Sequence, residues 1–243
     1  MQKLNFIKKL LFLIFFSSII FAHDAPYALQ KFRQVLDNSK LQAPKSPYNP
    51  RYSVKYGEFR YFSNRYFYLQ DAKFMVFFMC GKKNRSELRF KDEWRVETKY
   101  PKIIRAKLYL FPLDQKKEFT FLQIHANSNR TGINGKIINK PLLRLTWWKE
   151  QKSKRDHLWA VIRLSGEKNE QLYEKIDLGK RPKDFFTVSI EVQNSRMRIY
   201  LNKKLKIDKN VSYWNGYWNY FKAGVYLQGD GCSKVLFENL SVQ

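Results

Sequence analysis

Apolar and polar residues alternate along most of the chain beyond residue 52, and YFKAGVYLQ (residues 220–228) shows the pattern clearly. Successive side chains of a β-strand point to opposite faces, so every second residue shares a face. One face would carry Phe221, Ala223, Val225 and Leu227. The other would carry Tyr220, Lys222, Gly224, Tyr226 and Gln228. The first face suits a core. The second gathers phenols, an ammonium and an amide around a glycine, a residue that weakens a strand unless something approaches closely.

About a dozen short segments with β-strand character follow one another between residues 65 and 242. Many alternate apolar and polar residues, and turn-forming residues such as Gly, Asn and Asp separate them. Such a series, with no convincing helix inside it, predicts an all-β sandwich or barrel. We therefore assign residues 52–243 to a single β-domain.

The residues ahead of this domain follow another pattern. Between residues 25 and 38, Leu29, Phe32 and Val35 recur at helical spacing, which predicts a short amphipathic helix. Three prolines follow in LQAPKSPYNPRYS (residues 41–53), which indicates an extended linker on the domain surface. Residues 23–51 are thus predicted to form an N-terminal helix and a proline-rich linker.

Residues 1–22 have the features of a secretory signal peptide. Lys3, Lys8 and Lys9 precede an apolar run from residue 10 to 21, and cleavage is predicted near Ala22. The run is short for a membrane span, and an uncleaved N-terminal anchor is the alternative. We expect an exported protein, periplasmic or secreted, with no stable membrane insertion after cleavage.

The chain is strongly basic, with a formal net charge of +25. Removal of residues 1–22, which hold three lysines and no acid, would leave 221 residues and a charge of +22. Such a charge favours a polyanionic partner: nucleic acid, an acidic membrane surface or an acidic polysaccharide. Export argues against nucleic acid. Surface lysines that merely solvate the fold are the alternative explanation.

Two cysteines, Cys80 and Cys232, lie near the ends of predicted strands. An exported location permits a disulfide between them. Spacing along the sequence does not establish the distance between two α-carbons, so both a bridge and free thiols stay open.

Charged residues alternate in RSELR (residues 85–89), where Arg85, Glu87 and Arg89 would share one strand face. They would form either a solvated ladder of ion pairs, which adds little stability, or a recognition site. In the second case an arginine fork would bind a substrate carboxylate in bidentate fashion, and the glutamate would hold the fork in place.

A third polar face lies in FTFLQIHAN (residues 119–127), where Phe121, Gln123 and His125 would point to the same side. A lone histidine on a strand is more often structural than catalytic. His125 has a neighbouring amide on its own face, however, so it is the stronger candidate for proton transfer.

The chemistry of these three faces excludes several classes of enzyme. They hold no pair of catalytic carboxylates for glycoside hydrolysis, no serine in a nucleophile elbow and no closely spaced metal ligands. A cation and an amide can neutralise a carboxylate and stabilise an enolate-like intermediate beside it. A tyrosine or histidine can then exchange protons with the substrate.

The segments RSELR, QIH and YFKAGVYLQ, in this order, resemble the signature segments of the alginate lyases of polysaccharide lyase family 7. The resemblance extends over about residues 52–243. It implies a β-jelly roll of two antiparallel sheets with a substrate groove along the concave sheet. The implied activity is β-elimination by a carbon–oxygen lyase, which leaves 4,5-unsaturated uronate ends on alginate. No metal or organic cofactor is implied; the expected partner is an acidic polysaccharide, and we expect a monomer.

The resemblance also implies roles for single residues. Tyr226 would protonate the glycosidic oxygen and, for one uronate epimer, remove the C5 proton. His125 would serve as the base for the other epimer or would help to neutralise the carboxylate. Gln123 and Arg85 would bind the substrate carboxylate. The remaining expected groove residues are Glu87, which would orient the arginines, and Arg89, Lys222, Tyr220 and Gln228. Gly224 would leave room for a sugar ring.

The chain departs from the family pattern in places. Ala126 and Leu227 stand where a glycine and a polar residue are more usual. Residues 127–143 form a long stretch that would flank the groove and add positive charge through Arg130 and Lys136. In the family that these motifs resemble, an isoleucine at the position of Ile124 tends to accompany activity on guluronate-containing blocks. A lyase for another polyuronate, and a non-catalytic acidic-glycan binder on the same fold, are the alternatives.

Overall fold

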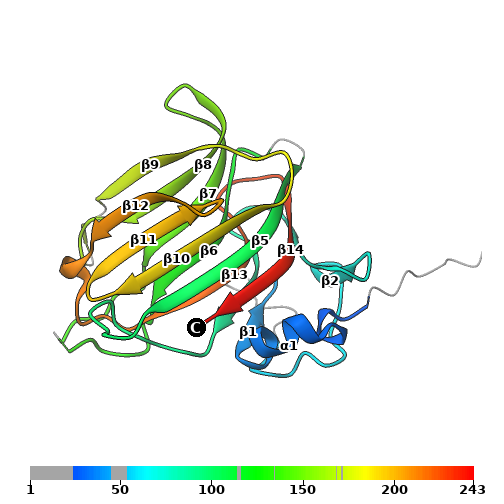
Figure 1. The fold of residues 1–243 in the computed structure, drawn as a ribbon, viewed down its shortest axis with the longest axis horizontal. Coiled ribbons are helices and arrows are strands. Elements are labelled where there is room, and N and C mark those ends of the chain that lie inside the picture. Colours follow the sequence, from blue (N-terminus) through cyan, green and yellow to red (C-terminus); the bar gives the residue numbers. More distant parts are fainter. Residues whose placement is uncertain (1–23, 45–53, 114–115, 134, 168, 171) are drawn as a thin grey trace, which may run out of the picture.

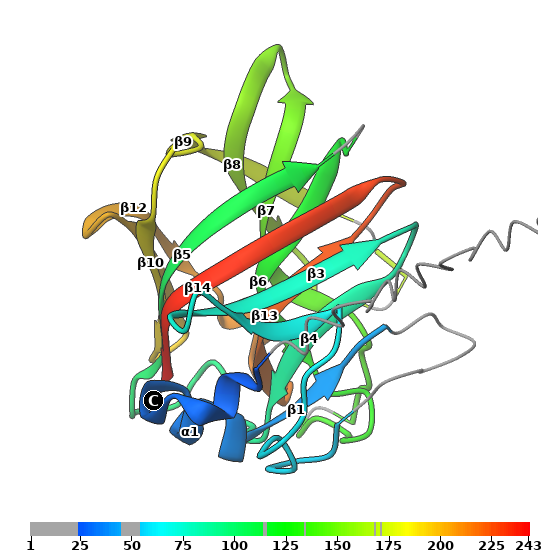
Figure 2. The same cartoon turned by 90° about the vertical axis from the view of Figure 1, so that its right-hand side faces the viewer.

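The structure, a computed structural model, describes residues 24–44, 54–113, 116–133, 135–167, 169–170 and 172–243. In this part of the chain two antiparallel seven-stranded sheets pack face to face as a jelly-roll sandwich (Figures 1 and 2). The prediction of an all-β sandwich is confirmed. We call the two layers the cleft sheet and the opposite sheet.

The cleft sheet has the strand order β1-β4-β13-β6-β7-β8-β9. Its strands are β1 (Ser39–Gln42), β4 (Arg85–Phe90), β6 (Glu118–Ala126), β7 (Pro141–Gln151), β8 (Lys154–Arg163), β9 (Tyr173–Lys180) and β13 (Asn219–Leu227). Strand β13 pairs with β4 on one side and with β6 on the other. The three motifs from the sequence therefore lie side by side in one sheet.

The opposite sheet has the order β12-β11-β10-β5-β14-β3-β2. Its strands are β2 (Phe67–Gln70), β3 (Phe74–Cys80), β5 (Lys102–Leu113), β10 (Phe186–Gln193), β11 (Arg196–Leu201), β12 (Lys204–Asn210) and β14 (Cys232–Val242). Cys80 and Cys232 are directly opposed where β3 meets β14, with α-carbons 4.1 Å apart, and they form a disulfide. The bridge that the sequence left open is therefore present.

The inner faces of both sheets meet in one continuous core. Leu88, Ile124 and Ala223 enter it from the cleft sheet, while Leu108 and Val235 enter it from the opposite sheet. All five are 0% exposed. The residues between these positions on the same strands face outward and can carry polar side chains, as the period of two predicts.

The N-terminal part contains a 3₁₀ helix (Pro26–Ala28) and the helix α1 (Gln30–Asp37), and a second 3₁₀ helix (Ser212–Trp214) precedes β13. Helix α1 lies at one end of the sandwich, against β1 and β14 (Figure 2). Phe32 and Val35 are buried there, as the amphipathic pattern predicts.

The predicted linker differs from the structure at its start. Ser39–Gln42 is the edge strand β1, paired with β4, and Leu41 is 0% exposed. Pairing with β4 orders this stretch, so the cleft sheet begins before residue 52. The predicted signal peptide and residues 45–51 of the linker lie outside the described residues. Within the described part, no helix has the length and apolar character needed to cross a bilayer.

Candidate active site

A cleft of about 590 Å³ runs across the outer face of the cleft sheet. It is lined by Lys40, Gln42, Arg85, Arg89, Gln123, His125, Asn127, Ser128, Asn129, Asn139, Lys140, Pro141, Arg144, Tyr173, Tyr220, Tyr226 and Gln228. Seven of the nine residues that the sequence predicted for the site are in this set. The two others, Glu87 and Lys222, are buried beneath it.

The register of three strands brings these side chains together. Tyr226 of β13 lies opposite Arg85 of β4, and Tyr220 lies opposite His125 of β6. Lys222, between the two tyrosines, is opposite Gln123. Directly opposed residues on one sheet face have side chains within contact range. The site is thus a product of strand pairing between segments more than 90 residues apart.

Glu87, Lys222 and Gln123 form a buried polar cluster under the cleft. Lys222 donates from Nζ to Glu87 Oε2 at 2.6 Å, and Gln123 donates from Nε2 to Glu87 Oε1. Both charged side chains are only 1% exposed. Burial acts to raise the pKa of Glu87, but the Lys222 ammonium and Arg85 lower it below its usual range. The carboxylate therefore stays ionised and fixes the amide of Gln123.

This arrangement corrects the roles expected for Lys222 and Glu87. Lys222 does not line the groove, because its ammonium is directed at Glu87 and is enclosed. Glu87 lies 3.8 Å from Arg85 Nε but makes its hydrogen bonds to Lys222 and Gln123. Since a carboxylate only accepts hydrogen bonds, Gln123 must turn its NH₂ group toward Glu87. Its amide is thereby oriented for a ligand in the cleft.

His125 is held as a neutral imidazole. Its Nδ1 lies 2.8 Å from the carbonyl oxygen of Ala126, which only accepts, so Nδ1 carries the proton and Nε2 keeps a lone pair. The ring stacks on Tyr220, with centroids 5.6 Å apart. Burial first, and the Lys222 ammonium second, lower the pKa of His125 to about 3. His125 is therefore uncharged near neutral pH and can accept a proton at Nε2, although burial makes it a weaker base than an exposed histidine.

Two arginines lie over the two tyrosines of the cleft. The guanidinium carbon of Arg85 is 4.6 Å from the ring centroid of Tyr226, and that of Arg89 is 4.0 Å from Tyr220. Arg89 also pairs with Glu93 at 2.7 Å. Stacking and ion pairing restrict both guanidinium groups. The cleft thus presents fixed positive charge next to the phenol of Tyr226.

A shift of register in β6 changes which residues face the cleft. Between Thr120 and Leu122 the pairing with β7 slips by one residue, and the pairing with β13 is irregular at the same place. Phe121 consequently points into the core, where its ring meets Phe186 at 6.4 Å. The expected placement of Phe121 beside Gln123 is wrong. A bulge inserts one residue and breaks the alternation.

Gly224 has a different role from the one expected. Its φ is +141°, and a β-carbon there would lie 2.2 Å from the Ser86 carbonyl oxygen and 2.8 Å from the Glu87 α-carbon. The space that the glycine provides is filled by strand β4 and by Phe77 of the opposite sheet, 3.0 Å away. The close approach that the sequence indicated is to a neighbouring strand and not to a sugar ring.

Several lining residues were not predicted. Lys40 and Gln42 come from β1, Arg144 from β7 and Tyr173 from β9. The alternation in LLRLTWW could have revealed Arg144, since Leu143 and Leu145 on either side of it are buried. Strand β1 is too short to carry such a signal. Ile124 faces the core at 0% exposure, so it has no contact with the cleft.

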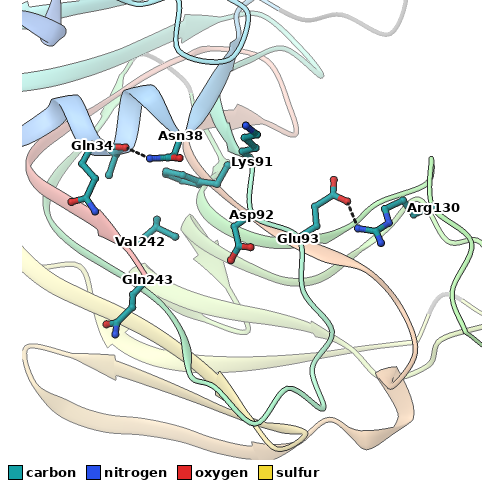
Figure 3. A pocket seen from close by; sticks show the side chains of 10 residues that line it. Gln34, Asn38, Lys91, Asp92, Glu93, Arg130, Val242 and Gln243 are labelled. Carbon is teal, nitrogen blue, oxygen red and sulfur yellow. Dashed lines mark hydrogen bonds and ion pairs between the residues drawn. The ribbon is translucent and has the colours of Figure 1, made fainter.

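The loop after β6 flanks the cleft as expected, through Asn127, Ser128 and Asn129. Arg130 turns away from it. Arg130 pairs with Glu93 at 3.2 Å and borders a separate hollow beside α1 (Figure 3). Lys136 pairs with Glu167. The positive charge expected from these two residues is thus partly offset by carboxylates.

The cleft walls combine five cations, several amides, a neutral imidazole and phenols. The cations are Lys40, Arg85, Arg89, Lys140 and Arg144. None of the described lining residues carries a carboxylate. This set favours an anionic ligand and can stabilise negative charge that develops next to a bound carboxylate.

Comparison with known proteins identifies the family. The family model described as "Alginate lyase" matches residues 35–243. An alginate lyase of Photobacterium sp. is 30% identical over 250 residues, which cover 90% of this chain and 87% of the relative. The chain therefore belongs to the alginate lyase family and is a lyase that cleaves alginate. The match begins at Val35, ahead of the range given by the motifs, in agreement with the position of β1.

Solved structures agree with this assignment. The structure of alginate lyase AlyC3 in complex with dimannuronate has a TM-score of 0.80 and 25% identity, over 91% of this chain and 95% of that chain. Alginate lyase A1-II', a member of polysaccharide lyase family 7, has a TM-score of 0.69 over 86% of this chain and 95% of its own. At 18% identity the second shows a shared fold.

Proposed function

We propose that Arg85, Gln123, His125 and Tyr226 catalyse β-elimination on alginate in the cleft. The observation that carries this proposal is their convergence on one sheet face, with a neutral His125 and an ionised Glu87 behind Gln123. The similar lyase AlyC3 has been solved with dimannuronate, which supports a uronate as the ligand of this cleft.

The reaction begins with the uronate carboxylate. Arg85 and the second N–H of the Gln123 amide, the one not donated to Glu87, bind it and offset its charge, which lowers the pKa of the adjacent C5–H group. His125 Nε2, or Tyr226 as a phenolate, removes the C5 proton, the base depending on the epimer. The electron pair forms the C4–C5 double bond as the C4–O bond breaks. The leaving glycosidic oxygen takes a proton from Tyr226, and the product carries a 4,5-unsaturated end.

The role of Tyr226 is tested by Tyr226→Phe, which removes one hydroxyl. We expect turnover of alginate to fall by about 10³-fold or more, because loss of a general acid–base group typically costs 10²–10⁴-fold. The rate is followed by ultraviolet absorbance of the new conjugated double bond, and polymer retention is measured in parallel. Tyr100→Phe, at a side chain that is 80% exposed, is the matched control. A Tyr226→Phe enzyme that keeps more than a tenth of the rate would refute the role.

The same assay distinguishes alginate lyase activity from the two alternatives, a lyase for another polyuronate and a non-catalytic glycan binder. Absorbance that rises with another polyuronate but not with alginate would keep the mechanism and change the substrate. Retention of the polymer by the wild-type chain with no rise on any polyuronate would support the glycan-binding alternative.

We further propose that the chain is exported through residues 1–22, cleaved near Ala22 and acts as a monomer in the periplasm or outside the cell. The basic start and apolar run support a signal peptide, and the Cys80–Cys232 disulfide fits an oxidising compartment. Mass spectrometry of the protein from its own cell would find an N-terminus near His23. An intact Met1 on a membrane-bound protein would favour the anchor.

A further inference from the structure

The outer face of the opposite sheet carries a row of exposed or half-exposed side chains along β5. Arg105, Lys107, Tyr109 and Phe111 alternate with core residues, so all four point away from the core. We call them the β5 row. At about 3.3 Å per residue the row spans roughly 20 Å. Strands β10 and β14 lie on either side of β5 (Figure 1), on the far side of the sandwich from the cleft.

One half of the row borders a hollow of about 370 Å³. Its lining is Arg105, Ala106, Lys107, Thr187, Val188, Ser189, Tyr200, Lys203, Asn239 and Ser241. Arg105 lies between Ser189 and Ser241 in the register, and Lys107 lies between Thr187 and Asn239. The described lining thus holds three cations, with hydroxyls and an amide between them. Lys107 is paired with Glu238 at 2.6 Å, just outside this lining, so Arg105 and Lys203 carry most of the positive charge offered to a ligand.

The other half of the row is aromatic. The Tyr109 and Phe111 rings are 4.2 Å apart, Tyr109 is 5.7 Å from Phe185, and Phe185 stacks on Phe74 at 4.8 Å. Lys234 Nζ lies 4.8 Å from the Phe111 centroid. These rings are partly exposed and lie outside the hydrophobic core between the sheets. The surface therefore offers flat apolar faces next to an ammonium.

We propose that the β5 row and its hollow form a second, non-catalytic binding surface for the acidic polysaccharide that the cleft cleaves. Hydroxyls and an amide match sugar hydroxyls, cations match uronate carboxylates, and aromatic faces match the C–H faces of pyranose rings. A hollow lined by cations, beside a row of aromatic rings on the same strand, suits this ligand better than a second copy of the chain, because the centre of a protein–protein contact is depleted of charge. The inference rests on the proposed function, because it takes the same substrate.

The second surface would act by raising the effective concentration of polymer at the cleft. Two sites on one chain that hold one polymer bind it more tightly than either site alone. A short oligosaccharide cannot reach from one face of the sandwich to the other. The surface should thus affect the polymer and leave turnover of short substrates unchanged.

The test compares Arg105→Ala/Lys107→Ala and Tyr109→Ala with the wild-type chain. The control is Lys204→Ala/Lys206→Ala, which removes the same charge from exposed positions of β12 on the same sheet. Retardation in alginate gels and KM for polymer are measured beside kcat/KM for a uronate trisaccharide. We expect both β5 variants to bind the polymer about five-fold more weakly. The control and all trisaccharide rates should match the wild type.

Other outcomes would overturn the proposal. Equal losses in the β5 variants and in the Lys204/Lys206 control would mean a general charge effect. Unchanged polymer affinity in both β5 variants would show that the β5 row does not bind the polymer. Loss of binding to anionic phospholipid vesicles or of a dimer on size exclusion, with alginate affinity intact, would assign the face to a membrane or to a second copy. Failure of the proposed function would show separately, as no trisaccharide turnover in the wild type.

Discussion

Lys222 shows how one residue can belong to a functional motif without touching the ligand. It stands between Tyr220 and Tyr226 on the cleft face of β13, yet its ammonium is enclosed against Glu87. A buried ion pair does not generally add net stability, because desolvation offsets attraction. In this protein the ion pair orients other groups. Glu87 fixes the amide of Gln123, and the Lys222 ammonium lies close enough to His125 to lower its pKa.

Lys222→Met should destabilise the protein by about 3–5 kcal/mol, since it leaves the Glu87 carboxylate buried without its partner. Urea unfolding measures this change. The double variant Glu87→Gln/Lys222→Met should recover much of the loss, because neither of the two fully buried charges remains. Lys206→Met, at an exposed position, is the control and should stay within about 0.5 kcal/mol of the wild type. A Lys222→Met protein as stable as that control would contradict the buried pair.

The lowered pKa of His125 predicts that the stability of the protein depends on pH. Its pKa is about 3 in the folded chain, lowered by burial and by Lys222, against an ordinary value near 6.5. Between pH 6.5 and 3 the unfolded chain binds a proton that the folded chain does not. The free energy of unfolding therefore falls as pH drops through this window, and it is unaffected by His125 above it.

His125→Gln should make the decline of the unfolding free energy between pH 6.5 and 4 shallower than in the wild type. Urea unfolding at several pH values measures this. The imidazole signal of His125 in NMR spectra should stay in the neutral form from pH 8 to 5. A midpoint near pH 6.5 for that signal would show that the ring is solvated and that burial and Lys222 do not lower its pKa.

At the scale of elements, the sequence predicted the direction of side chains correctly where two strands pair in regular register. RSELR and YFKAGVYLQ pair with each other without a slip, and the period of two placed Arg85, Arg89, Tyr220 and Tyr226 on the cleft face correctly, although β13 is irregular where it meets β6. Phe121 was misplaced because the bulge in β6 arises from its pairing with two neighbours. Strand β1 was missed because four residues before a run of prolines have no pattern of their own, and β4 orders them.

Gly224 tests the contact between β13 and β4. Gly224→Ala should destabilise the protein by about 2–5 kcal/mol, because the added methyl would overlap the backbone of β4 and the positive φ is strained for alanine. Gly229→Ala is the matched control, since a β-carbon there would meet nothing within 4 Å. Thermal and urea unfolding measure both. Equal stability of the two variants would show that β13 and β4 are not so closely packed.

At the scale of the molecule, the candidate active site and the disulfide lie on different sheets of the sandwich. The cleft occupies the outer face of one sheet, while the disulfide joins β3 and β14 in the other. The chain has a formal net charge of +25, and cations line both the cleft on one sheet and the hollow of the β5 row on the other. Sequence composition predicted the polyanionic partner, but only strand pairing shows which cations converge.

The disulfide provides the whole-molecule test, because it closes a loop between residues 152 positions apart. Cys80→Ser/Cys232→Ser should lose about 2–5 kcal/mol of stability, as the unfolded chain regains freedom. Turnover of alginate at a temperature well below unfolding should persist, since β14 stays paired with β3 and β5 and the cleft lies on the other sheet. Calorimetry and the absorbance assay measure the two effects, and a reductant should shift the wild type but not the variant. A folded variant without turnover would instead show that the bridge supports the geometry of Tyr226 through the turn between β13 and β14.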